Sequence, residues 1–347
     1  MSLNIPTSQS RTVYDPPAGD VRRPLLTPLP TPGEFLLVID NSSLEKWKRC
    51  PKAAYYYLVL GREAHARNAA LTFGGAVHVG LEKLLRGEPD EIQVTSIVKH
   101  FTENPTPPDE YRTVETAVSV LGHYRQRASF PDFAWEILAD TNGLIIERAF
   151  ELPLGVLEVE IELPDFGRID KIHVAWSGRI DVVATVNGRN RICDHKTSSI
   201  SGDQFVQSFQ LSSQTVGYVW AARQLWPELD VTGFCLNAIH LKKPGKGQGL
   251  MDRGARGGEP PLSFARYYFD YATARMDEWA NDTLTHIEDF VHCLSRGVFP
   301  MNDRQCFDKF GQCPYFPVDI IDDPVVRERF INSEQFKEVT WNPTHDR

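Results

Sequence analysis

Residues 179–196 read RIDVVATVNGRNRICDHK, and this stretch decides the fold. Two apolar, β-branched runs flank Asn187-Gly188, which predicts a two-residue hairpin because both loop positions adopt positive φ. Asp181 and Asp194 each lie six residues outside that loop, so the register places them opposite each other. Lys196 shares their face, because alternate strand residues point to the same side.

Two carboxylates and one ammonium group therefore converge on one point of the predicted hairpin. Opposed carboxylates repel unless a cation lies between them, and oxygen ligands suit a divalent ion beside a scissile phosphate. The alternative is an ordinary surface ion pair. Because apolar residues surround Asp181 and Asp194 in sequence, we expect a buried strand pair, where uncompensated carboxylates would be costly.

Composition is that of a soluble globular chain: 347 residues, 41% hydrophobic and 24% charged. No apolar run is long enough for a membrane span and residues 1–10 do not resemble a signal peptide, so we expect a cytoplasmic protein without membrane association. A formal charge of -9 argues against coating nucleic acid through bulk electrostatics, but it is compatible with a nuclease that has a local basic path. The six cysteines lack the dense spacing of a disulfide framework.

Proline-rich residues 1–33 predict a disordered leader. A single domain is expected over residues 34–320, followed by a tail over 321–347. Its parts are a helical arm (34–135), a catalytic core (144–270), and a C-terminal helix with a cysteine segment (271–320).

Hydrophobic periodicity and turn residues predict the individual elements. Ser42 and Glu45 form a capping box that opens the first helix, and Gly74 with Gly75 indicates a close backbone approach at the start of the second. The expected helices are 73–85, 113–128, 203–225 and 272–294. The expected strands are 144–150, 157–161, 171–176, 180–186, 191–195, 231–241 and 264–269.

Five motifs occur in an order that resembles the PD-(D/E)xK nuclease superfamily, in particular its RecB-like branch of CRISPR-associated and phage exonucleases. Gly178 to Asp181 precedes Asp194 to Thr197, and Phe73 to His78 resembles the branch's first motif. Gln214 with Tyr218 resembles its Q-x-x-x-Y helix, and residues 43–51 resemble its N-terminal cysteine segment. The resemblance covers about residues 40 to 320.

This resemblance implies an α/β restriction-endonuclease-like core, a mixed central sheet flanked by helices, with an N-terminal helical arm and a C-terminal cysteine segment. The implied ligands of Mg²⁺ or Mn²⁺ are His78, Asp181, Asp194 and the backbone carbonyl of His195. Lys196 would be the catalytic lysine, and Gln214 and Tyr218 would position substrate or that lysine. Asp170 ends a second copy of the GRID tetrapeptide but has no hairpin partner, so we exclude it.

The cysteine segment resembles the part of the branch that holds a [4Fe-4S] cluster with one upstream and three downstream cysteines. Cys50, Cys306 and Cys313 stand at matching places, but Asp319 occupies the fourth. Four thiolates are the usual ligands, so three outcomes stay open: a labile cluster, a three-cysteine site for another metal, or no metal. The structural alternative is that these cysteines only pack the segment onto the arm.

We therefore expect a metal-dependent DNA exonuclease that acts on DNA ends, single strands favoured, in recombination, repair or mobile-element processing. The alternatives are a non-catalytic DNA-end-binding scaffold and a structural metal or iron-sulfur module. Nothing in the sequence indicates a protein partner. A glycine-rich loop over 241–258 carries five basic residues and could either follow a phosphate backbone or be simply solvated, whereas Cys193 and Cys235 are expected in the core.

Overall fold

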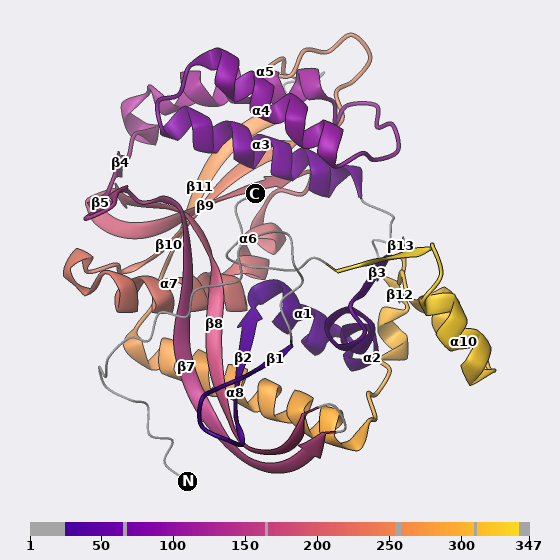
Figure 1. The fold of residues 1–347 in the computed structure, drawn as a ribbon. Coiled ribbons are helices and arrows are strands. Elements are labelled where there is room, and N and C mark those ends of the chain that lie inside the picture. Colours follow the sequence, from indigo (N-terminus) through magenta and orange to yellow (C-terminus); the bar gives the residue numbers. More distant parts are fainter. Residues whose placement is uncertain (1–24, 65–67, 164–165, 254–257, 309–310, 340–347) are drawn as a thin grey trace. The chain divides into compact units, whose positions relative to one another are not determined.

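The computed structural model describes residues 25–64, 68–163, 166–253, 258–308 and 311–339. Its chain forms two compact units, each assembled from separate stretches of sequence (Figure 1). The site unit comprises residues 67–148 and 180–276, and the arm unit comprises residues 1–66, 149–179 and 277–346. None of the helices in the described ranges is both long and apolar enough to cross a membrane.

A mixed sheet forms the centre of the site unit, as expected for the α/β class. Its strands follow the order β8-β9-β10-β11, in which the middle pair is parallel and the outer pairs are antiparallel. The bounds are β8 Gly167–Val186, of which residues 180–186 belong to this unit, β9 Arg189–Ser198, β10 Gly233–Leu241 and β11 Leu262–Asp270. Every residue of β10 is buried, which is typical of a strand covered on both faces.

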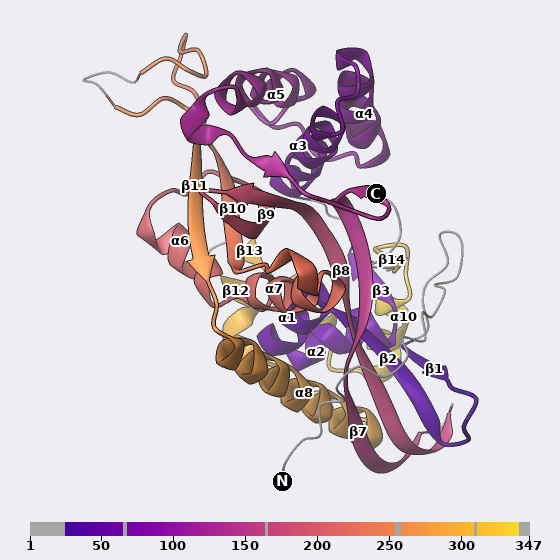
Figure 2. The ribbon, with the colours of Figure 1, turned by 90° about the vertical axis from the view of Figure 1, so that its left-hand side faces the viewer.

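Helices cover this sheet on both faces (Figures 1 and 2). One layer is α3 Ala69–Leu85, α4 Asp90–Glu103 and α5 Val114–Ala128, whose apolar side chains share a core with Ile239 and Leu241 of β10. The other layer is α6 Asp203–Gln210 and α7 Ser213–Leu225. Consecutive residues of a strand point to opposite faces of the sheet. Asp194 contacts α7 and the next residue, His195, contacts α5, so the two helical layers lie on opposite faces.

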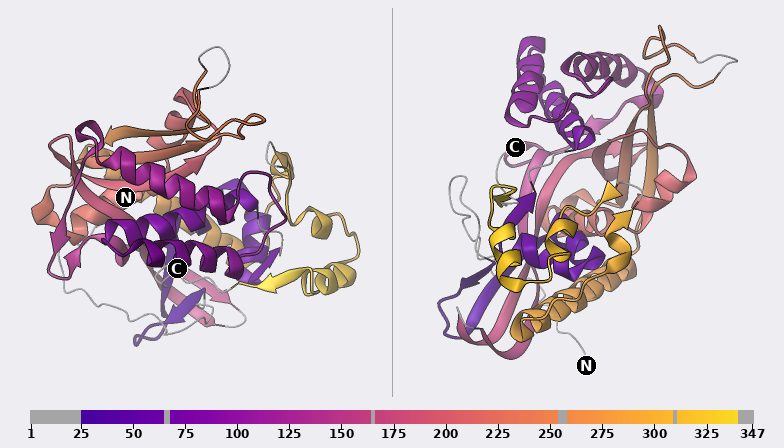
Figure 3. Two further views of the ribbon diagram at one scale, coloured as in Figure 1. Left: turned by 90° about the horizontal axis from the view of Figure 1, so that it is seen from above. Right: turned by 90° about the vertical axis from the view of Figure 1, so that its right-hand side faces the viewer.

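Strands and helices of the arm unit bring its N- and C-terminal segments together. β1 Leu26–Pro28, β2 Glu34–Asp40, β7 Ile146–Leu163 and the first half of β8 form its sheet, with β2 parallel to β8. Its main helices are α1 Asn41–Arg49, α2 Pro51–Ala54, α8 Thr273–Arg296, α9 Phe316–Asp319 and α10 Pro324–Ile331. β14 Phe336–Glu338 pairs with β3 Arg62–Ala64, so the C-terminal segment, yellow in Figure 3, lies against the indigo N-terminal one.

Both ends of the chain contain structure that the sequence did not predict. The expected leader lies outside the described residues up to position 24, but Leu26 is buried in β1. The expected tail contributes α10 and β14, with Ile331 and Phe336 buried in one apolar cluster. β1 pairs with the neighbouring strand β2, whereas β14 pairs with β3, more than 270 residues earlier in the chain, and local composition reveals neither pairing.

Element boundaries differ from prediction where a cap or a long strand intervenes. Helix α1 is capped by Asp40, whose side chain accepts a hydrogen bond from the backbone N–H of Ser43 at 2.8 Å, so the capping box based on Ser42 is wrong. The single helix predicted over 203–225 is divided into α6, which ends at Gln210, and α7, whose N-cap is Ser212. The four strands predicted from 144 to 186 merge into β7 and β8, because extended pairing continues through Gly155 and Gly178.

Candidate active site

The β8-β9 hairpin has the predicted register. Val186 pairs with Arg189 and Val182 with Cys193, and Asn187 and Gly188 have φ of 51° and 70°. The next position outward is Asp181 beside Asp194, both buried. One carboxylate oxygen of Asp181 accepts a hydrogen bond from the backbone N–H of His195 at 2.9 Å, so the two strands are also linked through the acidic side chain.

Asp194 lies between a cation and an amide. Its Oδ2 is 2.7 Å from Nζ of Lys196, and its Oδ1 accepts a hydrogen bond from Nε2 of Gln214 on α7 at 3.1 Å. Burial raises the pKa of Asp194, the ammonium of Lys196 opposes that rise, and the charge of Asp181 adds to it. A second cation at this point would relieve the repulsion between the two carboxylates.

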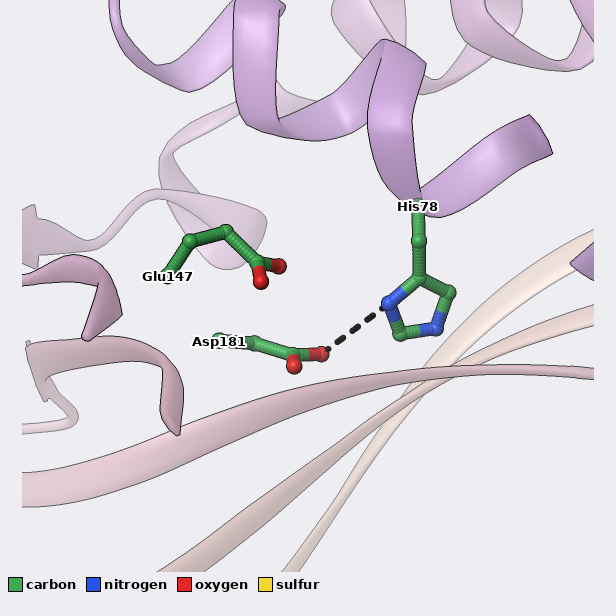
Figure 4. A group of neighbouring side chains, drawn as sticks. All are labelled: His78, Glu147 and Asp181. Carbon is green, nitrogen blue, oxygen red and sulfur yellow. Dashed lines mark ion pairs between the residues drawn. The ribbon is translucent and has the colours of Figure 1, made fainter. Parts of the chain in front are cut away.

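Helix α3 contributes His78 to the same place. Nδ1 of His78 lies 3.3 Å from Oδ2 of Asp181 (Figure 4). A Cβ on Gly74 would lie 2.9 Å from Oγ1 of Thr197, so only glycine allows the helix to approach β9 this closely. The predicted close backbone approach is therefore confirmed, and it brings His78, one turn further along the helix, to the acidic pair.

Glu147 completes a group that the sequence did not reveal. One ligand atom from each of His78, Glu147 and Asp181 lies within 4.8 Å of the others, and the three side chains face one another (Figure 4). This spacing suits ligands that surround a divalent cation, whose bonds to oxygen are about 2.0 to 2.6 Å. Glu147 has a φ of 49°, unusual outside glycine, and backbone strain of this kind often occurs at functional sites. No local pattern distinguishes it from the other glutamates of β7.

His195 and Tyr218 are both buried, as expected for residues that support the site rather than meet solvent. Burial holds the pKa of the His195 ring well below its usual value. Tyr218 lies on α7 one turn after Gln214, and Gln214 contacts Asp194 directly. Ligation by the carbonyl of His195 and by Asp194 remains a prediction, and so does a role for Tyr218.

Two other features of the sequence are not members of this group. Asp170 belongs to the arm unit, where its half-exposed carboxylate pairs with Arg168 at 2.7 Å. In the glycine-rich loop, Lys242 and Lys243 form exposed ion pairs with Glu259 and Glu110, and residues 254–257 lie outside the described part of the chain. That this loop follows the phosphate backbone of a nucleic acid therefore stays a prediction.

The cysteines divide into two sets. Cys193 and Cys235 are fully buried in one apolar cluster of the site unit, which confirms them as core residues. In the arm unit, the backbone N–H of Cys313 donates to the carbonyl of Cys306 at 2.8 Å, and the backbone N–H of Asn302 donates to Sγ of Cys50 at 3.4 Å. Burial raises the pKa of the Cys306 thiol, and the nearby charges of Cys313, Asp319 and Cys50 add to this rise.

Asp319 stands where the resemblance expects a fourth cysteine, and its Oδ1 accepts a hydrogen bond from the hydroxyl of Tyr56 at 2.7 Å. The cysteines and Asp319 are thus neighbours in one unit, but within the described ranges they do not form a tight ligand group like that around His78.

A comparison with protein families matches residues 41–318 to the model of the PD-(D/E)XK nuclease superfamily. No curated protein matches the chain. Among solved structures, a candidate exonuclease from Eubacterium rectale is 11% identical with a TM-score of 0.45, over 82% of this chain and 93% of that one. The crystal structure of SSO0001 is 13% identical with a TM-score of 0.23, over 70% of this chain and 84% of that one.

Proposed function

The chain belongs to the PD-(D/E)XK nuclease superfamily, and we propose that within it this protein is a Mg²⁺- or Mn²⁺-dependent deoxyribonuclease that hydrolyses phosphodiester bonds at DNA ends. The observation that carries the proposal is the convergence of His78, Glu147 and Asp181 beside the Asp194–Lys196 pair. These five side chains come from four elements of the site unit, α3, β7, β8 and β9, and packing alone does not require so many ionisable groups in one place.

The donor set fits a divalent cation. His78, Glu147 and Asp181 would hold it, with Asp194 and the carbonyl of His195 as the further ligands that the family resemblance implies. When bound, such an ion polarises the phosphoryl oxygen and lowers the pKa of a coordinated water molecule. The hydrogen bond from the N–H of His195 engages one oxygen of Asp181 and so fixes the orientation of its carboxylate.

Lys196 has the position and charge to act on the attacking water or on the phosphate. Its ammonium is only partly exposed and is held 2.7 Å from Asp194, which keeps the long side chain in place. Gln214 restrains the other oxygen of Asp194, so the carboxylate and the lysine are oriented as a unit. These contacts support a preorganised site for phosphate chemistry.

Cleavage assays on labelled DNA with Mg²⁺ or Mn²⁺ test the proposal. We expect Asp194→Ala and Lys196→Ala to abolish cleavage while the protein stays folded and binds DNA. Asp170→Ala is the matched control, because this aspartate ends an identical tetrapeptide but pairs with Arg168 on the surface. Loss of activity in Asp170→Ala with retention in Asp194→Ala would overturn the assignment of the site.

End specificity, a preference for single strands, and a role in recombination, repair or mobile-element processing rest on the resemblance to the exonuclease branch. Comparing linear and circular substrates, each single- or double-stranded, tests the first two. Efficient cutting of closed circles would instead indicate an endonuclease. DNA binding without cleavage by the parent protein would favour the non-catalytic scaffold.

We further propose that Cys50, Cys306 and Cys313 hold an iron-sulfur cluster in the arm unit. Support comes from the family resemblance, from the backbone hydrogen bond between Cys313 and Cys306, and from the position of all three cysteines and Asp319 in one unit. Anaerobic purification followed by iron and sulfide analysis is the test. Brown protein that bleaches on Cys50→Ser is expected, whereas a colourless, folded and active protein would show that these cysteines only pack the segment.

A further inference from the structure

Behind the catalytic strand, His195 is anchored by a polar contact on the face opposite Asp194 and Lys196. Its Nδ1 lies 2.6 Å from Nδ2 of Asn237 on β10, and its ring packs edge-on against Tyr124 and Trp135. Asn237 is fully buried, so its amide has no water with which to exchange this partner.

Arg266 on β11 determines how the Asn237 amide is oriented. Nε of Arg266 donates to Oδ1 of Asn237 at 3.2 Å, and a guanidinium group can only donate. The amide oxygen of Asn237 must therefore face Arg266, which leaves its Nδ2 to donate to His195 and to the hydroxyl of Tyr124 at 2.8 Å. The guanidinium of Arg266 is itself held over the ring of Trp135, at 4.1 Å from the ring centre.

A fixed amide selects one tautomer of the histidine. Because Nδ1 of His195 accepts from Asn237, the ring hydrogen is assigned to Nε2. Within the described part of the chain, this Nε2 has no hydrogen-bond partner. Asn237 is thus the polar contact that sets the ring's orientation, and ring packing supplies the rest.

We propose that Asn237, oriented by Arg266, is a positioning residue for the reaction: by anchoring His195 it holds the strand that carries Asp194 and Lys196 and donates to Asp181. This inference rests on the proposed function. It follows from two observations on one residue, since His195 bonds to Asn237 through its side chain and to Asp181 through its backbone. Loss of the anchor would let the backbone of residue 195 shift, and the three ionisable groups would shift with it.

Asn237→Leu removes the anchor at nearly constant volume. The control is Asn190→Leu on the same strand as His195, because this asparagine too is held by side-chain hydrogen bonds: two for Asn190, at 2.7 Å to Thr185 and 2.6 Å to Leu229, against three for Asn237. We expect Asn237→Leu to lower kcat and Mn²⁺ affinity by about 10- to 100-fold, the usual effect of removing an outer-shell partner, with KM for DNA unchanged. Asn190→Leu should keep kcat and Mn²⁺ affinity even where its melting temperature falls equally.

Equal kcat and Mn²⁺ affinity in Asn237→Leu and the parent would overturn the proposal. Equal losses in both variants at matched stability would overturn it too, because the effect would then be general destabilisation.

A nitrogen-15 NMR spectrum of the histidine side chains gives a readout that needs no activity, and its first measurement uses the parent protein. In the metal-free parent, we expect the His195 signals of the tautomer protonated at Nε2, and Asn237→Asp should move the hydrogen to Nδ1 by replacing a donor with an acceptor. A parent ring protonated at Nδ1 would refute the proposal. If the parent fails to cleave DNA but shows the expected tautomer and the expected loss of Mn²⁺ affinity in Asn237→Leu, the proposed function fails while the anchoring of the site stands.

Discussion

Two glycine-to-alanine substitutions in the site unit should differ in their effect on stability: Gly122→Ala should stabilise the protein and Gly74→Ala should not. Gly74 on α3 faces Thr197 of β9, whereas Gly122 on α5 is exposed and has no atom within 4 Å of the position where its Cβ would lie. The chemical change is the same in both helices. A difference between the two variants therefore reports the close approach of α3 to β9.

The expected magnitudes follow from helix propensity and packing. Alanine is favoured over glycine inside a helix by about 1 kcal/mol, and Gly122→Ala should gain most of that. At Gly74 the new Cβ would lie 2.9 Å from Oγ1 of Thr197, well inside van der Waals contact. Overpacking of this kind costs about 1 to 3 kcal/mol, so Gly74→Ala should range from neutral to a loss of about 2 kcal/mol.

The consequence for the site is a displaced His78, which lies one turn after Gly74. We expect Gly74→Ala to weaken Mn²⁺ binding, measured by calorimetry, and Gly122→Ala to leave it unchanged. Urea unfolding of each variant gives the free-energy changes, compared at equal m-values.

Thr197→Ala supplies the decisive control, because it removes the atom that the new methyl group would contact. In that background Gly74→Ala should become stabilising by about 1 kcal/mol, as at Gly122, and Mn²⁺ affinity should recover. If Gly74→Ala is as stabilising as Gly122→Ala in the parent protein, α3 does not press against β9 and this account of the glycine is refuted.

Three further predictions concern single side chains. Glu147→Gln should lower Mn²⁺ affinity in calorimetry, whereas Glu158→Gln, an exposed glutamate of the same strand, should not; equal affinities would remove Glu147 from the site. Burial raises the pKa of Asp194, so the folded metal-free protein binds a proton at this carboxylate more tightly than the unfolded chain does. The free energy of unfolding should therefore fall as pH rises above about 4, the ordinary pKa of a carboxyl group. Thermal unfolding in chelator across this range should show a flatter profile for Asp194→Asn, and an identical slope would contradict the raised pKa. Tyr56→Phe should cost about 1 kcal/mol in urea unfolding by removing the hydrogen bond to Asp319, and an unchanged midpoint would show that this bond adds no net stability.

Features that depend on neighbours within a few residues were predictable from the sequence. The hairpin register follows from Asn187-Gly188, because positive φ at both positions leaves one two-residue loop. That register brings Asp181 to Asp194 and Lys196. The close approach at Gly74 has a separate cause, which is the absence of a side chain at this glycine. The superfamily resemblance based on these motifs is confirmed by the family match over residues 41–318.

Contacts between distant segments were not predictable in the same way. Local spacing does not distinguish Glu147 from the other glutamates of its strand, and it becomes a candidate ligand only because β7 begins beside α3 and β8. The division of the chain into two units that are each built from separate stretches of sequence, and the burial of Phe336, also depend on partners far along the chain.

The hairpin, its two aspartates and the position of Lys196 beside them were predictable from the sequence alone, because turn chemistry and strand alternation act over a few residues. The tertiary structure alone decided which helix brings His78 to that pair, which glutamate joins it, and how Arg266 and Asn237 orient His195 from behind. These choices depend on the packing of α3, β7, β10 and β11 around one strand, and packing is set by the shapes and partners of residues that lie tens to more than a hundred positions apart.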